Sequence, residues 1–127
     1  MSKLERLLTY QLKAARFPPH VEQYPLFAIK VGEGKGVRKR LEKAGYKNYK
    51  YDFAWPELKT VVEVQGGTWL KVSGHSSGKG QTRDYDKLNQ ASELGWTSLW
   101  FTGSMIKSGR ALKSIETVLK LRRSFDA

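Results

Sequence analysis

Two carboxylates and an amide interrupt the most strand-like segment of this sequence, DFAWPELKTVVEVQGG, which covers residues 52–67. The three polar residues are Asp52, Glu63 and Gln65, and most of their neighbours are aromatic or β-branched. Two carboxylates that meet on a half-buried surface repel each other, and their pKa values rise. Such a pair is tolerated when a hard cation binds it, and oxygen ligands of this kind suit Mg²⁺ or Mn²⁺. The segment therefore predicts a divalent-metal site.

A β-hairpin is the element that we expect to position these residues. Residues 49–55 and 60–65 have the composition of two strands, and a turn at residues 56–57 joins them. Side chains alternate across a strand, so Asp52 and the aromatic residues beside it take opposite faces, of which the aromatic one is the expected core. A tight hairpin then brings Asp52 opposite or diagonal to Glu63. The alternative is that both carboxylates point to solvent and pair with lysines.

The rest of the chain predicts helices and strands that would surround this hairpin. Their expected ranges are a helix over 2–16 with a possible Ser2–Glu5 capping box, a strand over 21–30, a short helix over 37–44, a helix over 83–94, a strand over 96–101 and a helix over 109–123. Residues 66–82 are rich in glycine and serine, so we expect a mobile surface loop there. The order indicates one α/β domain over residues 1–127 with a mixed sheet.

The charge of the protein is large, positive and unevenly distributed. The net charge is +11, with twelve Lys/Arg against four acids in residues 1–50 and six against two in residues 107–127. Residues 51–106 carry five bases against six acids. Basic ends attract a polyanion, whereas a carboxylate cluster repels phosphate unless a divalent cation stands between them. The distribution favours a nucleic-acid partner, and the alternative is a surface that is merely well solvated.

A basic segment precedes the hairpin. Seven Lys/Arg fall between Lys35 and Lys50 with only Glu42 opposing them, and three tyrosines are interleaved with or follow them. Basic residues beside aromatic ones suit a nucleic-acid backbone and its bases, so the segment supplies candidate DNA contacts. These candidates are Arg38, Lys39, Arg40 and Lys43. A solvated helix face or hairpin explains the same composition equally well.

Several functional classes are disfavoured or excluded by composition and spacing. Cysteine is absent, which excludes disulfides and thiolate metal sites and favours an intracellular protein. The first residues lack the apolar core of a signal peptide, and no apolar run approaches a membrane span. The segment GHSSGKG has neither the spacing nor the Ser/Thr of a nucleotide-binding loop. With only His20 and His75, an HNH-type nuclease lacks its ligands.

The hairpin motif resembles that of a known superfamily. Asp52, a ten-residue gap and then Glu63-Val64-Gln65 resemble the PD-(D/E)XK nucleases, with Gln65 in the place usually held by lysine. The strings YDFAWPELKTVVEVQGGTW and RDYDKLNQASELGWTSLWFT are similar to small phage and prophage endonucleases of that superfamily, which are related to very-short-patch-repair endonucleases and archaeal-type Holliday-junction resolvases. The resemblance covers roughly residues 49–102 and leaves 32–47 as a basic insertion. It implies a restriction-endonuclease-like fold, with a central mixed sheet flanked by helices.

The resemblance also implies a metal site. Asp52 and Glu63 would bind Mg²⁺ or Mn²⁺, joined by the main-chain carbonyl of Val64. Glu5, in the first helix, corresponds to an acidic residue that completes the metal site in several relatives. Its alternative role is that of a capping acid with no part in catalysis.

Gln65 is where the sequence departs from the family pattern. An amide can orient water, but it supplies no positive charge and cannot act as a base. Some relatives recover the cation from the following helix, where Lys87 lies four residues after Arg83 and shares its face. Lys87 is therefore the catalytic candidate and Arg83 a phosphate contact, unless Lys87 only pairs with Asp84 or Glu93. The loop adds further candidates for phosphate contacts, with His75 also a candidate for proton transfer: Lys71, His75 and Lys79.

The resulting hypothesis is a metal-dependent DNA endonuclease. A small basic domain has little room to recognise sequence, so recognition of DNA shape is favoured. A four-way junction has two-fold symmetry, and a homodimer would supply its paired incisions. The leading expectation is a phage-type Holliday-junction resolvase in the cytoplasm of a bacterial host. The alternatives are a nicking or mismatch-type endonuclease and a basic nucleic-acid-binding module without activity.

Overall fold

The computed structural model describes residues 1–65 and 80–126. The glycine- and serine-rich loop expected over 66–82 therefore lies largely outside the described residues, as do three of the candidate site residues. These three are Lys71, His75 and Lys79. The hairpin, the helices around it and the remaining candidates lie within the described part of the chain.

A four-stranded mixed sheet forms the centre of the fold, with strand order β1-β2-β3-β4. β1 (Val21–Tyr24), β2 (Tyr51–Trp55) and β3 (Thr60–Gln65) are antiparallel neighbours, and β4 (Thr97–Thr102) runs parallel to β3. A parallel pair needs a crossover, which the helix between β3 and β4 in the sequence supplies. The predicted α/β class with a mixed sheet is confirmed.

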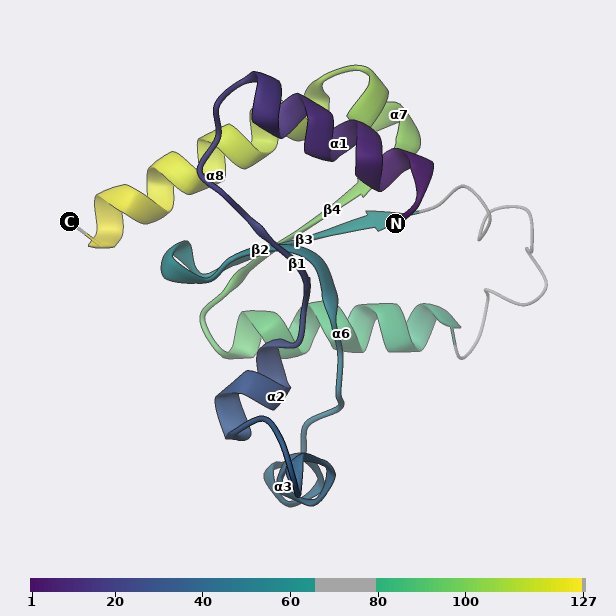
Figure 1. Ribbon diagram of the computed structural model, residues 1–127, viewed down its shortest axis with the longest axis vertical. Coiled ribbons are helices and arrows are strands. Elements are labelled where there is room, and N and C mark those ends of the chain that lie inside the picture. The colour runs from purple at the N-terminus through teal and green to yellow at the C-terminus, as the bar shows by residue number, and fades with distance from the viewer. Residues whose placement is uncertain (66–79, 127) are drawn as a thin grey trace.

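Helices cover both faces of this sheet (Figure 1). One face is covered by α1 (Lys3–Ala14), α7 (Gly103–Lys107) and α8 (Arg110–Asp126). The other is covered by α6 (Gln81–Glu93) and α2 (Leu26–Val31), with α3 (Val37–Ala44) beyond α2 at the far end of the molecule. None of the helices in the described part of the chain is long and apolar enough to cross a membrane.

The sheet separates two apolar cores. The first lies under α1, α7 and α8 and contains, among others, Leu8, Leu12, Phe53, Trp55, Val62, Phe101, Ile106 and Ile115. The second lies under α2, α3 and α6 and contains, among others, Tyr24, Phe27, Leu41, Tyr51, Ala54, Val61 and Ala91. The expectation of one apolar and one polar hairpin face is therefore wrong, because the face that carries Ala54 and Val61 is itself buried by α6.

The strand expected over residues 21–30 is only half correct. β1 ends at Tyr24, and after Pro25 the chain turns into α2, whose residues Leu26, Phe27 and Ala28 are all buried. Proline cannot donate to a strand ladder, so the ladder stops there and the apolar run that follows packs as a short helix. The structure also contains α7, which the sequence did not predict.

The other predicted helices and strands agree with the structure to within a few residues at their ends. The helix over 37–44 and the strand over 60–65 have the predicted bounds, as α3 and β3. The turn after Trp55 is one turn of 3₁₀ helix, Pro56–Leu58, followed by Lys59 in a left-handed conformation. β2 begins two residues later than expected, and α8 extends three residues further.

Candidate active site

Asp52 and Glu63 lie next to each other at the end of the β2–β3 ladder. Paired residues run from Trp55 and Thr60 to Phe53 and Val62, so the next position in the same register is Asp52 opposite Glu63. There the side chains bind the main chain: the Asp52 N–H donates to Glu63 Oε1 at 2.8 Å. The Val64 N–H donates to Asp52 Oδ2, also at 2.8 Å. Each carboxylate is thus fixed by the opposite strand.

The surroundings of both carboxylates disfavour their ionised form. Burial raises the pKa of Glu63 to about 7; the ammonium of Lys87 opposes this rise, and the Asp52 carboxylate adds to it. Burial also raises the pKa of Asp52, against the Val64 N–H that lowers it. The Glu5 carboxylate raises the pKa of Asp52 further. A bound cation would favour the ionised form of both carboxylates and so lower both pKa values.

Lys87 of α6 lies inside this site. Its Nζ is 3.0 Å from Glu63 Oε2, and the two side chains are only 15% and 13% exposed. The same Nζ lies 4.9 Å from the centre of the Tyr51 ring, while the Tyr51 hydroxyl donates to the main-chain oxygen of Lys87 at 2.6 Å. Within the described residues the ion pair of Lys87 is with Glu63 and not with Asp84 or Glu93. Tyr51 therefore contacts both the ammonium and the main chain of Lys87. The sequence did not single it out as a site residue.

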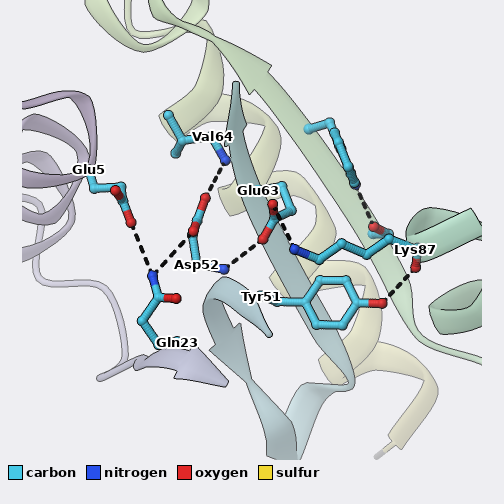
Figure 2. Close-up of polar contacts among 9 residues, drawn as sticks. Glu5, Gln23, Tyr51, Asp52, Glu63, Val64 and Lys87 are labelled. Carbon is cyan, nitrogen blue, oxygen red and sulfur yellow. Dashed lines mark hydrogen bonds and ion pairs between the residues drawn. The ribbon is translucent and has the colours of Figure 1, made fainter. Parts of the chain in front are cut away.

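Glu5 reaches the site from the opposite side, through a residue that sequence reasoning missed. Gln23 Nε2 donates to Glu5 Oε1 and to Asp52 Oδ1, each at 3.2 Å. Figure 2 shows the resulting chain of contacts, from Glu5 on α1 through Gln23 and Asp52 to Glu63 and Lys87 on α6. Only the β1–β2 register places Gln23 beside Asp52, so no local sequence signal marks it.

The capping box is also present, so the two predicted roles of Glu5 do not exclude each other. The Ser2 N–H donates to Glu5 Oε2 at 2.9 Å, and the Glu5 N–H donates to the Ser2 hydroxyl at 3.1 Å. The other carboxylate oxygen, Oε1, is the one that Gln23 binds. The cap therefore fixes the first turn of α1 with Glu5 pointing toward β1 and β2.

Gln65 lies near this network but, within the described residues, takes part in none of its hydrogen bonds. Among the described residues, no hydrogen bond joins Gln65 to Asp52, Glu63 or Lys87. Gln65 instead lines a pocket of about 440 Å³ with Arg83, Tyr85 and Trp100. The structure thus brings Arg83 close to Gln65, at the first turn of α6.

The basic candidates of α3 lie away from the carboxylates, at the far end of the molecule (Figure 1). Arg38, Lys39 and Lys43 are exposed. Arg40 is half-buried, and its guanidinium donates to the main-chain oxygens of Gly32, Glu33 and Lys35, including a bond of 2.9 Å to Lys35. Arg40 thus organises the loop before α3.

The tyrosines among these basic residues pack against Phe27. Their ring centres lie 4.9 Å from it for Tyr46 and 6.5 Å for Tyr49 and Tyr51. Tyr51 is fully buried, so its ring is not available to stack on bases. Tyr51 belongs to the second core, and Tyr46 and Tyr49 pack against it. This packing joins the segment to α6, whose Ala91 lies in the same core.

The donor set fits a divalent cation. Asp52 and Glu63 offer carboxylate oxygens, which hard cations such as Mg²⁺ and Mn²⁺ prefer. With Glu5 included, the network has three carboxylates and one ammonium, that of Lys87. It therefore carries a net negative charge when all four groups are ionised. Within residues 1–65 and 80–126, no three carboxylate or histidine side chains form one metal-binding cluster. A cation between Asp52 and Glu63 would complete its coordination with main-chain oxygens or water.

Comparison of the chain with protein-family models, with curated proteins and with solved structures finds no match.

Proposed function

We propose that this protein is a metal-dependent DNA endonuclease. The observation that carries the proposal is the site at the end of β2 and β3, where two half-buried carboxylates from adjacent strands meet one ammonium. The net charge of +11 supports a polyanionic substrate, which a carboxylate site would otherwise repel. Phosphodiester hydrolysis is the reaction class that uses both features.

Each residue of the site has a role in this reaction. Asp52 and Glu63, which lie side by side on β2 and β3, would hold Mg²⁺ or Mn²⁺, and the main-chain carbonyl of Val64 would be a further ligand. The chemistry that a cation would supply there is a lower pKa for a bound water and an offset to the negative charge on the phosphate. Lys87 places its side-chain nitrogen beside Glu63 and would orient the attacking water, a role that the neutral amide of Gln65 fills only in part. Arg83, exposed one turn earlier on α6, contacts phosphate.

The proposed family is the PD-(D/E)XK superfamily, with a restriction-endonuclease-like fold. A helix, three antiparallel strands, a helix and a fourth strand parallel to the third support this assignment. The placement of Lys87 supports it as well, because the positive charge missing at Gln65 comes from the next helix. The basic insertion around residues 32–47 then corresponds to α3 and the loop before it, between β1 and β2.

The proposed substrate is branched DNA, with a four-way junction first. The chain forms a single small α/β unit in its described part, which leaves recognition of DNA shape as the main source of selectivity. A homodimer supplies the two incisions that a two-fold symmetric junction requires. A phage or prophage enzyme of this kind acts in the cytoplasm of its bacterial host.

The test uses labelled four-way junction, flap, mismatched duplex and linear duplex, each with Mg²⁺ or with EDTA. We expect paired cuts in the junction that need Mg²⁺. Asp52→Asn and Glu63→Gln are expected to lower the rate by at least about 100-fold while DNA binding is kept, and Lys87→Met to lower it more than Lys87→Arg. Glu57→Gln is the matched control, because Glu57 is an exposed acid in the hairpin turn.

Three outcomes would contradict parts of the proposal. Full activity of both carboxylate variants would refute the site. Equal cutting of linear duplex would refute the junction substrate and favour a nicking or mismatch-type enzyme. Tight DNA binding without cleavage of any substrate in Mg²⁺ or Mn²⁺ would indicate a non-catalytic binding module.

A further inference from the structure

Gln23 has an unusual backbone for its place in the fold. Its φ angle is 48°, in the left-handed region that residues with a side chain rarely adopt. The other described non-glycine residues with positive φ, Arg16 and Lys59, each follow a helical segment, where such a conformation commonly ends a turn. Gln23 instead lies inside β1, where a regular strand would cost less. Its surroundings must therefore favour this conformation, and strain of this type occurs most often at functional sites.

The contacts of the Gln23 side chain lead into the active site. The β1–β2 pairs Glu22–Phe53 and Tyr24–Tyr51 enclose the position at which Gln23 faces Asp52. From there its amide nitrogen donates to Asp52 Oδ1 and Glu5 Oε1, each at 3.2 Å. Ionised carboxylates only accept hydrogen bonds, so the nitrogen and not the oxygen of the amide faces them.

These contacts complete the orientation of two carboxylates. Asp52 has one oxygen bound by the Val64 N–H and the other by Gln23. Glu5 has one oxygen bound by the Ser2 N–H and the other by Gln23. Gln23 is the one side chain in the described residues that hydrogen-bonds to both, and it joins the first turn of α1 to β2. Each oxygen keeps a lone pair free for a further partner.

We propose that Gln23 is a positioning residue for the cation. It holds Asp52 and Glu5 at one fixed separation and orientation, so that the carboxylates are arranged before a cation binds. The inference rests on the proposed metal-dependent function and adds to it the residue that links Glu5 to the site. Partners of this kind, one step removed from the metal, typically change metal affinity by 10- to 100-fold when they are lost.

The test measures Mn²⁺ binding by calorimetry on the full chain without DNA, so it does not depend on catalysis. Gln23→Met keeps the length of the side chain and removes its amide, and we expect it to lower Mn²⁺ affinity about 10-fold. Gln23→Gly loses the amide and also relieves the left-handed backbone, so it is expected to fold at least as well as Gln23→Met and to lose the same affinity. Glu22→Gln, an exposed acid on the same strand, is the control and should bind Mn²⁺ like the parent.

A double-mutant cycle separates positioning from a general effect on stability. If Gln23 acts through Glu5, then Glu5→Gln and Gln23→Met together lower the affinity less than the product of their single effects. Unchanged or tighter Mn²⁺ binding by Gln23→Met and Gln23→Gly, with melting temperatures in EDTA near that of the parent, would overturn the proposal. If Asp52→Asn abolishes Mn²⁺ binding in that case, the metal site stands and only the role of Gln23 is refuted. If the parent does not bind Mn²⁺, both are refuted.

Discussion

At the scale of single residues, Glu63 is a carboxylate whose surroundings oppose its ionisation. It is largely buried, lies beside a second carboxylate and has Lys87 as its cationic partner. Burying a carboxylate costs more than a single ion pair usually returns, and its pKa rises in consequence. Without a cation the site is therefore held together at some cost to stability.

This conflict predicts how the stability of the metal-free protein depends on pH. The pKa of Glu63 is about 7 in the folded protein and about 4.5 when unfolded, so the folded state binds the proton more tightly. The stabilisation is fully present below pH 4.5 and is lost as the pH rises through 7. Its size is at most about 3 kcal/mol. Melting temperatures in EDTA between pH 5 and pH 8 should fall with pH in the parent.

The Glu63→Gln variant provides the comparison, because an amide has no proton to lose. Its melting temperature is expected to change clearly less over the same range, and to exceed that of the parent at pH 8. Glu57→Gln, which is exposed in the hairpin turn, should keep the slope of the parent. Parallel slopes for the parent and Glu63→Gln would show that Glu63 titrates normally.

At the scale of elements, the docking of α6 onto β2 brings the ammonium to the carboxylates. Two tyrosines of this region bind the helix in different ways. Tyr51 donates to the main-chain oxygen of Lys87, and Tyr49 donates to the Asp86 carboxylate at 2.8 Å. Burial raises the pKa of Tyr51, so its hydroxyl remains a donor. The tyrosines thus bind α6 at two adjacent residues, Asp86 and Lys87.

The two tyrosines form a matched pair for mutation. Tyr51→Phe and Tyr49→Phe each remove one hydroxyl and should each destabilise the protein by about 1–2 kcal/mol, measured by denaturant unfolding. Only Tyr51→Phe frees the backbone of Lys87, so we expect it alone to lower the cleavage rate in Mg²⁺, by several-fold. Equal rates for the two variants would mean that the position of Lys87 does not depend on Tyr51.

At the scale of the whole molecule, the carboxylates of the candidate site and the exposed basic residues of α3 occupy different regions. The carboxylates lie between α1 and α6, whereas Arg38, Lys39 and Lys43 lie exposed on α3 at the far end (Figure 1). A duplex that reaches both regions would extend along the molecule from the proposed catalytic site to α3. In this arrangement α3 contributes affinity and no chemistry.

This arrangement predicts a specific salt dependence. The double variant Lys39→Gln/Lys43→Gln is expected to weaken binding to every DNA equally and to reduce the slope of log K against log salt by about 0.9 per lost phosphate contact. Binding is measured by fluorescence anisotropy in the Asp52→Asn background, which prevents cleavage. Arg40→Gln is the contrasting variant, because the Arg40 guanidinium binds loop carbonyls. This substitution should mainly lower the stability of the protein and should change the salt slope little. An unchanged slope in the double variant would exclude α3 from the DNA interface.

The sequence alone determined most of the local structure. The capping box at Ser2, the helix over 37–44 and the strand over 60–65 were predicted because composition and side-chain periodicity act over a few neighbouring residues. The neighbouring carboxylates Asp52 and Glu63 were predicted for the same reason, since hairpin register is a local property. Their catalytic role stays a prediction.

Only the tertiary structure decided what surrounds that pair. Strand register between segments 29 residues apart places Gln23 against Asp52, and helix docking places Tyr51 under Lys87 and buries both faces of the sheet. Such contacts depend on how whole elements pack, and a single side chain carries no local mark of its distant partner. The sequence therefore determined which residues can do chemistry, and packing decided which of them meet, because register and docking are properties of the assembled sheet.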